Sequence, residues 1–419
     1  MPTKRVVIVG GGVSAKHCAE VVLKQGKDKV DVTVIQANRF VEWSLASATA
    51  FVDPSCHPRF LSTDCTKFEA KGATYTYATA EGVDMENKQV RLSNGAAPET
   101  FDALVVATGF ALPLFYPRLG VSVHERIAEV KLVANAISKA ACVVIGGGGL
   151  IALELAGDIR AHYADKTIIL ICRSGILTQW PDDFRQKVLD RMTKMSIQVV
   201  TAAFDAPKQP ALEPGTITVG DKQINYDAYF PAFAQGPNTQ FLQDVPGLLD
   251  SKGQIDVNEF LQSKACPEVF AVGVSNAPEP FVGMAKLDAQ WTSVAGNVVA
   301  MLANQPLKQH KEGASFMKLP PVVLLGHGPK GYGFLDFANL PPPLKVCCCC
   351  GWGGWPCCPP CWPCCACCGC GACPLGYCCG PAEGAGTAKV FGAMLQKFAG
   401  FHFGGMGQMG EVPQQQTMN

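Results

Sequence analysis

Two glycine-rich turns hold the residues of this chain whose types and spacing predict chemistry most directly. Each turn follows an apolar run rich in valine and isoleucine, has the spacing G-x-G-x-x-A, and precedes an amphipathic stretch; the turns occupy residues 10–15 and 147–152. Such a turn lets a pyrophosphate approach bare backbone, because glycine has no side chain in the way. The helix that follows offers unpaired N–H groups and the positive end of its dipole to the phosphates. Two such turns in one chain predict two dinucleotide sites.

The elements that must position these turns follow from the hydrophobic pattern. A strand, the first turn, a helix over residues 15–25 and a strand over residues 30–35 form one βαβ unit. The second turn opens a unit of the same plan, with a helix over residues 152–163 and a strand over residues 166–172. We therefore predict an α/β fold with two Rossmann-like domains, a small C-terminal segment and a cysteine-rich, low-complexity tail.

Composition narrows the range of partners. The 419 residues include 35 Lys and Arg and 35 Asp and Glu, so the formal net charge is zero and no basic stripe predicts a nucleic-acid partner. The first residues lead directly into a strand, which predicts neither a signal peptide nor a transit segment and favours the cytoplasm. The seven histidines are scattered without the spacing of metal ligands, so we predict no metal site from them.

Six short motifs follow one another in a fixed order along residues 4–336. The first glycine turn is followed by A-T-G at residues 107–109, and the second by E-L-A-G at residues 154–157. G-P-N-T at residues 236–239 and V-F-A-V-G at residues 269–273 complete the set. In this order the motifs resemble the two-dinucleotide-binding flavoproteins of the pyridine nucleotide-disulfide oxidoreductase superfamily. Within it, the chain is most similar to the type II NADH dehydrogenases and the apoptosis-inducing-factor-like, mitochondrion-associated (ferroptosis-suppressor) quinone reductases.

The resemblance implies that the first turn binds FAD and the second binds NADH or NADPH. The implied reaction passes a hydride from the nicotinamide to the flavin, and electrons from the flavin to a quinone-like acceptor. Disulfide reductases of the superfamily carry a cysteine pair just after the first βαβ unit, whereas residues 40–47 contain no cysteine, so the flavin is expected to meet its acceptor directly. The implied parts are a discontinuous FAD-binding domain (1–140 and 265–305), an NAD(P)-binding domain (141–264), a C-terminal cap segment (306–345), a Cys/Pro/Gly/Trp-rich block (346–382), and an amphipathic helix with a disordered end (383–419).

The resemblance also assigns candidate site residues. Glu154 is the candidate catalytic residue, because it matches the family glutamate near the contact of flavin and nicotinamide; its other interpretation is a first-turn carboxylate favoured by the helix dipole. Arg173 follows a strand that ends without an acid; it could accept a 2′-phosphate, which slightly favours NADPH, or could be a solvated surface arginine. The candidate cofactor-binding residues are Gly10, Gly11, Gly12, Val13, Ser14, Ala15, Gln36, Ala80, Thr108, Gly109, Gly147, Gly148, Gly149, Ala152, Arg173, Gly236, Gly273 and Val274.

Three positions depart from the family pattern at the FAD site. Gln36 stands where an acidic residue normally takes the ribose hydroxyls, and Ala48 lies where the ferroptosis-suppressor group has an arginine. Val274 replaces the aspartate that the family places on the ribityl chain; the loss of one charged hydrogen bond costs about 1.5–3 kcal/mol. These departures leave an alternative function: a degenerate flavoprotein with weak or no FAD, acting as an NAD(P)-binding, membrane-associated scaffold.

Fifteen of the 21 cysteines crowd between Cys347 and Cys379, in a stretch without charge from Lys345 to Glu383. Its prolines and glycines rule out a regular spanning helix. Vicinal cysteines among apolar residues resemble the palmitoylated string of the cysteine-string proteins, which predicts S-acylation and peripheral attachment to a membrane surface. Metal binding by thiolates and an inert or redox-exchanging tail are the other two interpretations. The acylation candidates are Cys347, Cys348, Cys349, Cys350, Cys357 and Cys358.

Overall fold

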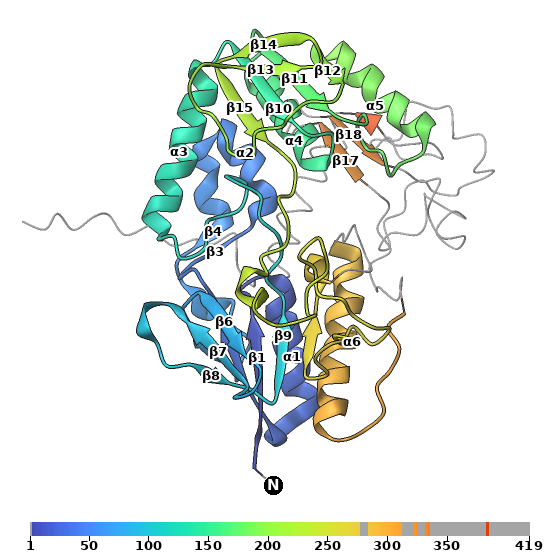
Figure 1. Ribbon diagram of the computed structural model, residues 1–419. Helices are drawn as coiled ribbons and strands as arrows, with labels where there is room; N and C mark the ends of the chain where they lie inside the picture. Colours follow the sequence, from blue (N-terminus) through green and yellow to red (C-terminus); the bar gives the residue numbers. More distant parts are fainter. Residues whose placement is uncertain (1, 277–283, 312–321, 326–331, 336–382, 385–419) are drawn as a thin grey trace, which may run out of the picture.

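The fold is built on two parallel sheets, one behind each glycine-rich turn. The computed structural model describes residues 2–276, 284–311, 322–325, 332–335 and 383–384, and Figure 1 shows the two sheets in the lower and upper halves of the molecule. The first sheet has the strand order β16-β9-β1-β2-β5 and the second has the order β12-β11-β10-β15. Neighbouring strands run parallel throughout both sheets. Their strands are β1 (Lys4–Val9), β2 (Val30–Ile35), β5 (Thr74–Thr76), β9 (Ala103–Val106), β10 (Cys142–Gly146), β11 (Thr167–Cys172), β12 (Ile197–Thr201), β15 (Ala228–Pro231) and β16 (Val269–Ala271).

Helices link the parallel strands and cover the sheets. In the first unit, α1 (Val13–Gly26) joins β1 to β2 and packs against α6 (Met284–Leu302). In the second unit, α4 (Leu150–His162) joins β10 to β11, and α5 (Asp182–Lys194) joins β11 to β12. Since helices cover the sheets, the strands are continuous apolar runs. The predicted α/β fold with two Rossmann-like units is confirmed, and the predicted helices and strands of both βαβ units begin and end within two residues of their observed bounds.

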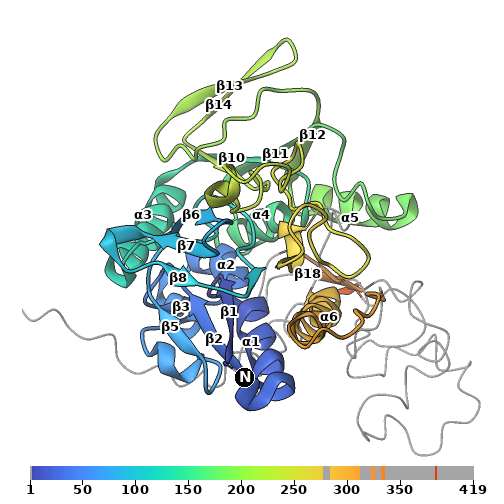
Figure 2. The same ribbon diagram turned by 60° about the horizontal axis from the view of Figure 1, so that its bottom comes forward.

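The remaining elements are short. The hairpin of β13 (Gly215–Val219) and β14 (Lys222–Tyr226) projects from the part of the molecule that holds the second sheet, as Figure 2 shows. The other strands are β3 (Val41–Glu42), β4 (Leu61–Ser62), β6 (Ala80–Asp84), β7 (Gln89–Leu92), β8 (Glu99–Thr100), β17 (Val322–Leu325), β18 (Tyr332–Leu335) and β19 (Glu383–Gly384). The 3-10 helices are η1 (Lys27–Lys29), η2 (Ser44–Ala46), η3 (Pro54–Phe60), η4 (Cys65–Lys67), η5 (Ser93–Gly95), η6 (Gln240–Leu242) and η7 (Gly273–Ser275). β17 packs along α4, so this part of the C-terminal region lies against the second unit.

Two helices that precede the second glycine-rich turn in the chain pack in the core of the second sheet. These are α2 (Ser47–Val52) and α3 (Val123–Lys139). The buried side chains of Phe51 and Val133 belong to the same apolar cluster as Ile145 of β10. The packing is therefore continuous across the predicted domain boundary near residue 140, and the division into domains stays a prediction.

Several predictions lie outside the described residues. They concern the cysteine-rich block, its acylation candidates and the amphipathic helix beyond residue 386. Within the described part of the chain, no helix combines the length and the apolar character that crossing a bilayer requires.

Candidate dinucleotide and redox site

The first glycine turn has the backbone geometry of a phosphate cradle. Gly10 has a φ of +133°, which glycine adopts without strain, and its N–H donates to the carbonyl of Ile35 at 2.9 Å. Gly12 lies directly before α1 with φ −88° and ψ −175°, and no side chain caps the helix there. A Cβ added at Gly12 would meet no atom of the described residues within 4 Å, so the start of α1 is open on that side.

The second turn repeats this geometry almost angle for angle. Gly147 has a φ of +130° and donates to the carbonyl of Ile171 at 2.8 Å. Gly149 lies before α4 with φ −88° and ψ 179°, again without a side-chain cap, and a Cβ there would meet no atom of the described residues within 4 Å. Ala15 and Ala152, the last residues of the two fingerprints, are fully buried where each helix meets its sheet. Both turns therefore fit a bound pyrophosphate.

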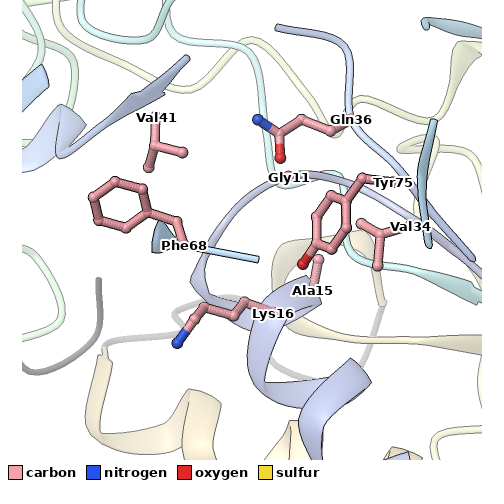
Figure 3. A pocket seen from close by; sticks show the side chains of 8 residues that line it. All are labelled: Gly11, Ala15, Lys16, Val34, Gln36, Val41, Phe68 and Tyr75. Carbon is pink, nitrogen blue, oxygen red and sulfur yellow. The ribbon is translucent and has the colours of Figure 1, made fainter. Parts of the chain in front are cut away.

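Gln36 directly follows β2 and lies over the first turn, as Figure 3 shows. Its Nε2 donates to the carbonyl oxygens of Asn38 at 2.8 Å and Phe40 at 3.3 Å, while its carboxamide oxygen points toward Gly11. The space left among Gln36, Gly11, Tyr75, Phe68 and their neighbours is about 10 Å³, roughly enough for one water. Because the amide nitrogen is already engaged, Gln36 presents the turn with an acceptor, as the expected carboxylate would, but without its charge.

Arg173 follows β11 at the second turn, and its side chain is exposed. The loop behind it returns to the turn, where the Leu177 N–H donates to the carbonyl of Gly148 at 2.8 Å. A Cβ at Gly148 would lie 2.5 Å from the carbonyl oxygen of Gly175, so the middle residue of this fingerprint must be glycine. The loop thus fixes Arg173 at the carboxyl end of β11, beside the second dinucleotide cradle.

Two crossing segments bring the carboxyl edges of the sheets together. After β9, Ala111 exchanges backbone hydrogen bonds with the segment after β15: its N–H donates to Gly236 and its carbonyl accepts from Gln235, both at 2.9 Å. The Asn238 side chain donates to the carbonyl of Thr108 at 3.1 Å. Gly236 has a φ of +108°, so the chain turns where few other residues could. The A-T-G and G-P-N-T motifs therefore meet at one point.

Glu154 lies one turn into α4, next to this crossing. Burial raises the pKa of Tyr116 to about 12, and the nearby charge of Glu154 adds to this rise. Tyr116 in turn packs edge-to-face on Phe110, with ring centroids 5.1 Å apart. The predicted catalytic residue, the second cradle and the crossing segments are thus brought together.

The carboxyl end of β16 offers neutral groups. The Gly273 N–H donates to Gln290 Oε1 at 2.7 Å, and the Val274 carbonyl accepts from Gln254 Nε2 at 2.9 Å. Ser275 Oγ lies 3.4 Å from Thr108 Oγ1. The valine side chain has no polar atom, so the ionic contact implied for this position by the resemblance is absent. Ala80 begins β6 opposite Leu92 and is half-buried.

A buried ion pair at α2 escaped the sequence analysis. Ala48 is buried in α2, and a guanidinium does reach this helix: Arg126 Nη2 of α3 lies 3.4 Å from Ser47 Oγ. Its Nε and Nη2 donate to the carboxylate of Glu42, each at 2.8 Å, and its Nη1 donates to Glu129 Oε2 at 2.7 Å. No local pattern reveals such a pair, because its members lie 84 residues apart in the chain.

The described cysteines are free thiols. Burial raises the pKa of Cys18 and Cys56 to about 12 and raises that of the other four as well. A thiol with a raised pKa is a poor nucleophile at neutral pH. No disulfide joins cysteines among the residues that the structure describes, which are Cys18, Cys56, Cys65, Cys142, Cys172 and Cys266.

Two parallel sheets, each with a pyrophosphate cradle at its carboxyl edge and joined at a single crossing, define a protein that binds two dinucleotides. The chain belongs to the pyridine nucleotide-disulphide oxidoreductase family, whose model matches residues 4–281. Its cofactors are therefore FAD and NAD(P)H, and it is an oxidoreductase.

Relatives of known name support this assignment. Over 221 residues the chain is 29% identical to an FAD-dependent oxidoreductase of Flammulina velutipes, covering 51% of this chain and 67% of that one. Over 344 residues it is 24% identical to the human ferroptosis suppressor protein 1, covering 74% and 84%. The sulfide:quinone oxidoreductase of Aquifex aeolicus has the same fold, with a TM-score of 0.61 at 18% identity over 81% of this chain and 85% of that one.

Proposed function

We propose that this protein passes electrons from NAD(P)H through FAD to a quinone-like acceptor. The observation that carries the proposal is the crossing of residues 109–111 and 235–238, since it brings the carboxyl edges of both sheets, and so both cradles, to one place. The flavin supplies the chemistry, because it accepts a hydride and releases electrons to an acceptor. The balanced reaction converts NAD(P)H, one proton and a quinone into NAD(P)⁺ and a hydroquinone.

The residues divide this work. Gly12 and Gly149 expose helix N-termini to the two pyrophosphates, and Gln36 accepts from a ribose hydroxyl of FAD. Glu154 is placed to orient the nicotinamide against the flavin. The free, protonated thiols favour direct transfer to the acceptor, because a relay needs a reactive pair. The likeness to the ferroptosis suppressor protein and the sulfide:quinone oxidoreductase supports an acceptor of quinone type.

Anaerobic stopped-flow reduction tests this function. NADPH should bleach the flavin absorbance at a rate compatible with turnover, and a short-chain benzoquinone should restore it within the same turnover. A glutathione disulfide or thioredoxin acceptor should leave the reduced flavin unchanged. Bleaching that only a disulfide reverses would contradict direct transfer to a quinone.

Arg173 is the residue on which the preference for NADPH over NADH depends in this proposal. An arginine at the end of the second strand of a dinucleotide unit can bind a 2′-phosphate, and β11 offers no carboxylate there. We expect NADPH to reduce the flavin more efficiently than NADH, and Arg173→Ala to lower that preference about tenfold, the effect of one lost charge-assisted bond. Arg191→Ala, on α5, serves as the matched control. An unchanged ratio in Arg173→Ala would remove this role.

Attachment to a membrane surface from the cytoplasm, through acylated cysteines in the tail, completes the proposal. Two or more chains give stable anchoring where one does not. Neutral hydroxylamine cleaves thioesters and should release the protein from membranes; retention after this treatment would count against acylation.

A second function stays open because of Val274 and the engaged amide of Gln36. A protein with weak FAD binding would serve as an NAD(P)-binding scaffold at the membrane. Purified protein that stays colourless after incubation with FAD would favour this second function and contradict the first.

A further inference from the structure

A cavity of about 160 Å³ lies between η3 and α3, outside the cradles and the crossing. The two helices line it through residues at matching spacing: Pro54, His57 and Pro58 on one side and Ile127, Val130 and Lys131 on the other. On the α-helix α3, residues three and four apart share one face, so Ile127, Val130 and Lys131 line the space from a single side of that helix. The start of α3 is fixed by a capping box, in which Ser122 and Glu125 exchange hydrogen bonds at 2.8 and 3.2 Å.

The size of the cavity sets the size of an occupant. An apolar cavity of roughly 150 Å³ holds one benzene ring. Two prolines, Ile127 and Val130 provide apolar walls suited to the faces and edges of such a ring. A single six-membered ring with a small substituent therefore matches the space.

The polar lining sets the charge of an occupant. His57 is 97% buried on its side chain, and its Nε2 has no hydrogen-bond partner within the described part of the chain. That nitrogen lies 3.5 Å from Glu42 Oε1, whose charge Arg126 already balances. Lys131 stands at the exposed end of the cavity. Both ionisable side chains that line it are bases, so an anionic group is favoured over a cationic one.

We propose that this cavity binds a single-ring monocarboxylic acid, with the ring between the prolines and the α3 side chains and the carboxylate at Lys131. The site is separate from the redox site and does not rest on the proposed function. Its ligand class, a small aromatic or alicyclic acid, follows from the volume, the apolar walls and the two bases.

Calorimetric titration of the full-length protein with benzoate, after saturation with FAD and NADPH, tests the proposal. Saturable binding is expected, with benzamide, the neutral isostere, binding about tenfold more weakly because it lacks the charge-assisted bond. Lys131→Met should weaken benzoate about tenfold as well, whereas Lys139→Met, at the exposed end of the same helix, should bind as the wild type does. The His57 ring signals in an NMR spectrum should shift on binding.

Each outcome decides the proposal. Binding that does not saturate, benzamide that binds as tightly as benzoate, or a Lys131→Met protein that binds normally would overturn it. Ile127→Phe narrows the cavity without altering charge and should abolish binding. If that variant fails to fold, the lysine pair and the His57 signals still decide, because Lys131 and Lys139 are both exposed.

Discussion

Arg126 and Glu42 form a bidentate ion pair inside the protein, with side chains that are 0% and 2% exposed. Glu42 lies in β3, which follows the first βαβ unit in the chain, and Arg126 lies on α3, whose Val130 and Val133 pack in the core of the second sheet. Nη1 of the same guanidinium also donates to the carbonyl of Leu114 at 2.6 Å. The pair thus links the segment after the first βαβ unit to the helix that precedes the second.

Breaking this pair should destabilise the protein strongly. Glu42→Gln removes the buried, bidentate counter-charge of Arg126 and leaves the guanidinium only the partly exposed Glu129; breaking a buried ion pair typically costs about 3–5 kcal/mol. The free energy of unfolding, measured in urea, should fall by that amount. The matched control is Lys4→Met, which removes the exposed Lys4–Asp102 pair and should cost less than about 1 kcal/mol. Equal losses of unfolding free energy in the two variants would show that the buried pair stabilises the protein no more than the exposed pair does.

Acid should act through the same carboxylate. Burial alone would raise the pKa of Glu42, but hydrogen bonds from the Arg126 guanidinium, together with the His57 ring 3.5 Å away, hold that pKa at about 2, against an ordinary value of 4.5. Since the folded pKa lies below the unfolded one, the stabilisation is present above about pH 4.5 and is lost as the pH falls toward 2. Wild-type stability should therefore drop more steeply with acid over this range than that of Glu42→Gln. Parallel curves for the two proteins would refute this assignment.

Substitutions at Gly12 and Gly149 should weaken cofactor binding while leaving the folded state intact. Gly12→Ala and Gly149→Ala introduce a methyl group that touches no atom of the described residues, so thermal stability should fall by no more than the small cost of alanine at a helix N-cap. Each methyl group would stand in the path of a pyrophosphate, so Gly12→Ala should weaken FAD binding and Gly149→Ala should weaken NADPH binding, each by at least about tenfold. Gly10→Ala is the contrasting variant, because its φ of +133° disfavours any side chain and its unfolding temperature should fall. Normal flavin content in Gly12→Ala would contradict the assignment of the first cradle.

Restoring a carboxylate at Val274 should tighten FAD. Val274→Asp adds one charged hydrogen bond to the ribityl chain, a gain of about one to two decades in the dissociation constant of FAD. Val274→Asn has nearly the same shape without the charge and should gain less. Fluorescence titration of the deflavinated protein measures both. An aspartate variant that binds no more tightly than the wild type would show that this position does not face the cofactor.

Local spacing predicted much of the fold and part of the site. The two glycine turns fix their own strands and helices, because the turn, the helix start and the close packing at Ala15 and Ala152 are properties of adjacent residues. The position of Gln36 at the end of β2 followed from the same spacing. The direction of its carboxamide did not, since it depends on the carbonyl oxygens of Asn38 and Phe40.

Long-range contacts lay beyond the sequence analysis. The pair of Glu42 and Arg126 depends on the placement of α2 and α3, and α2 has only six residues, too few for a helical period to stand out. The cavity at His57 depends on how η3 meets α3. The sequence of either helix alone does not indicate which other element it will contact.

The pairing of β16 with β9 has a consequence for how the protein is made. Val269–Ala271 completes the sheet begun at Lys4–Val9, so the ribosome must synthesise the entire second unit before the first can close. Until then one side of β9 exposes unpaired backbone groups, which invite association with other strands. A nascent chain stalled or cleaved before residue 269 should therefore be an aggregation-prone client of chaperones, although its first glycine turn and its first βαβ unit are already complete.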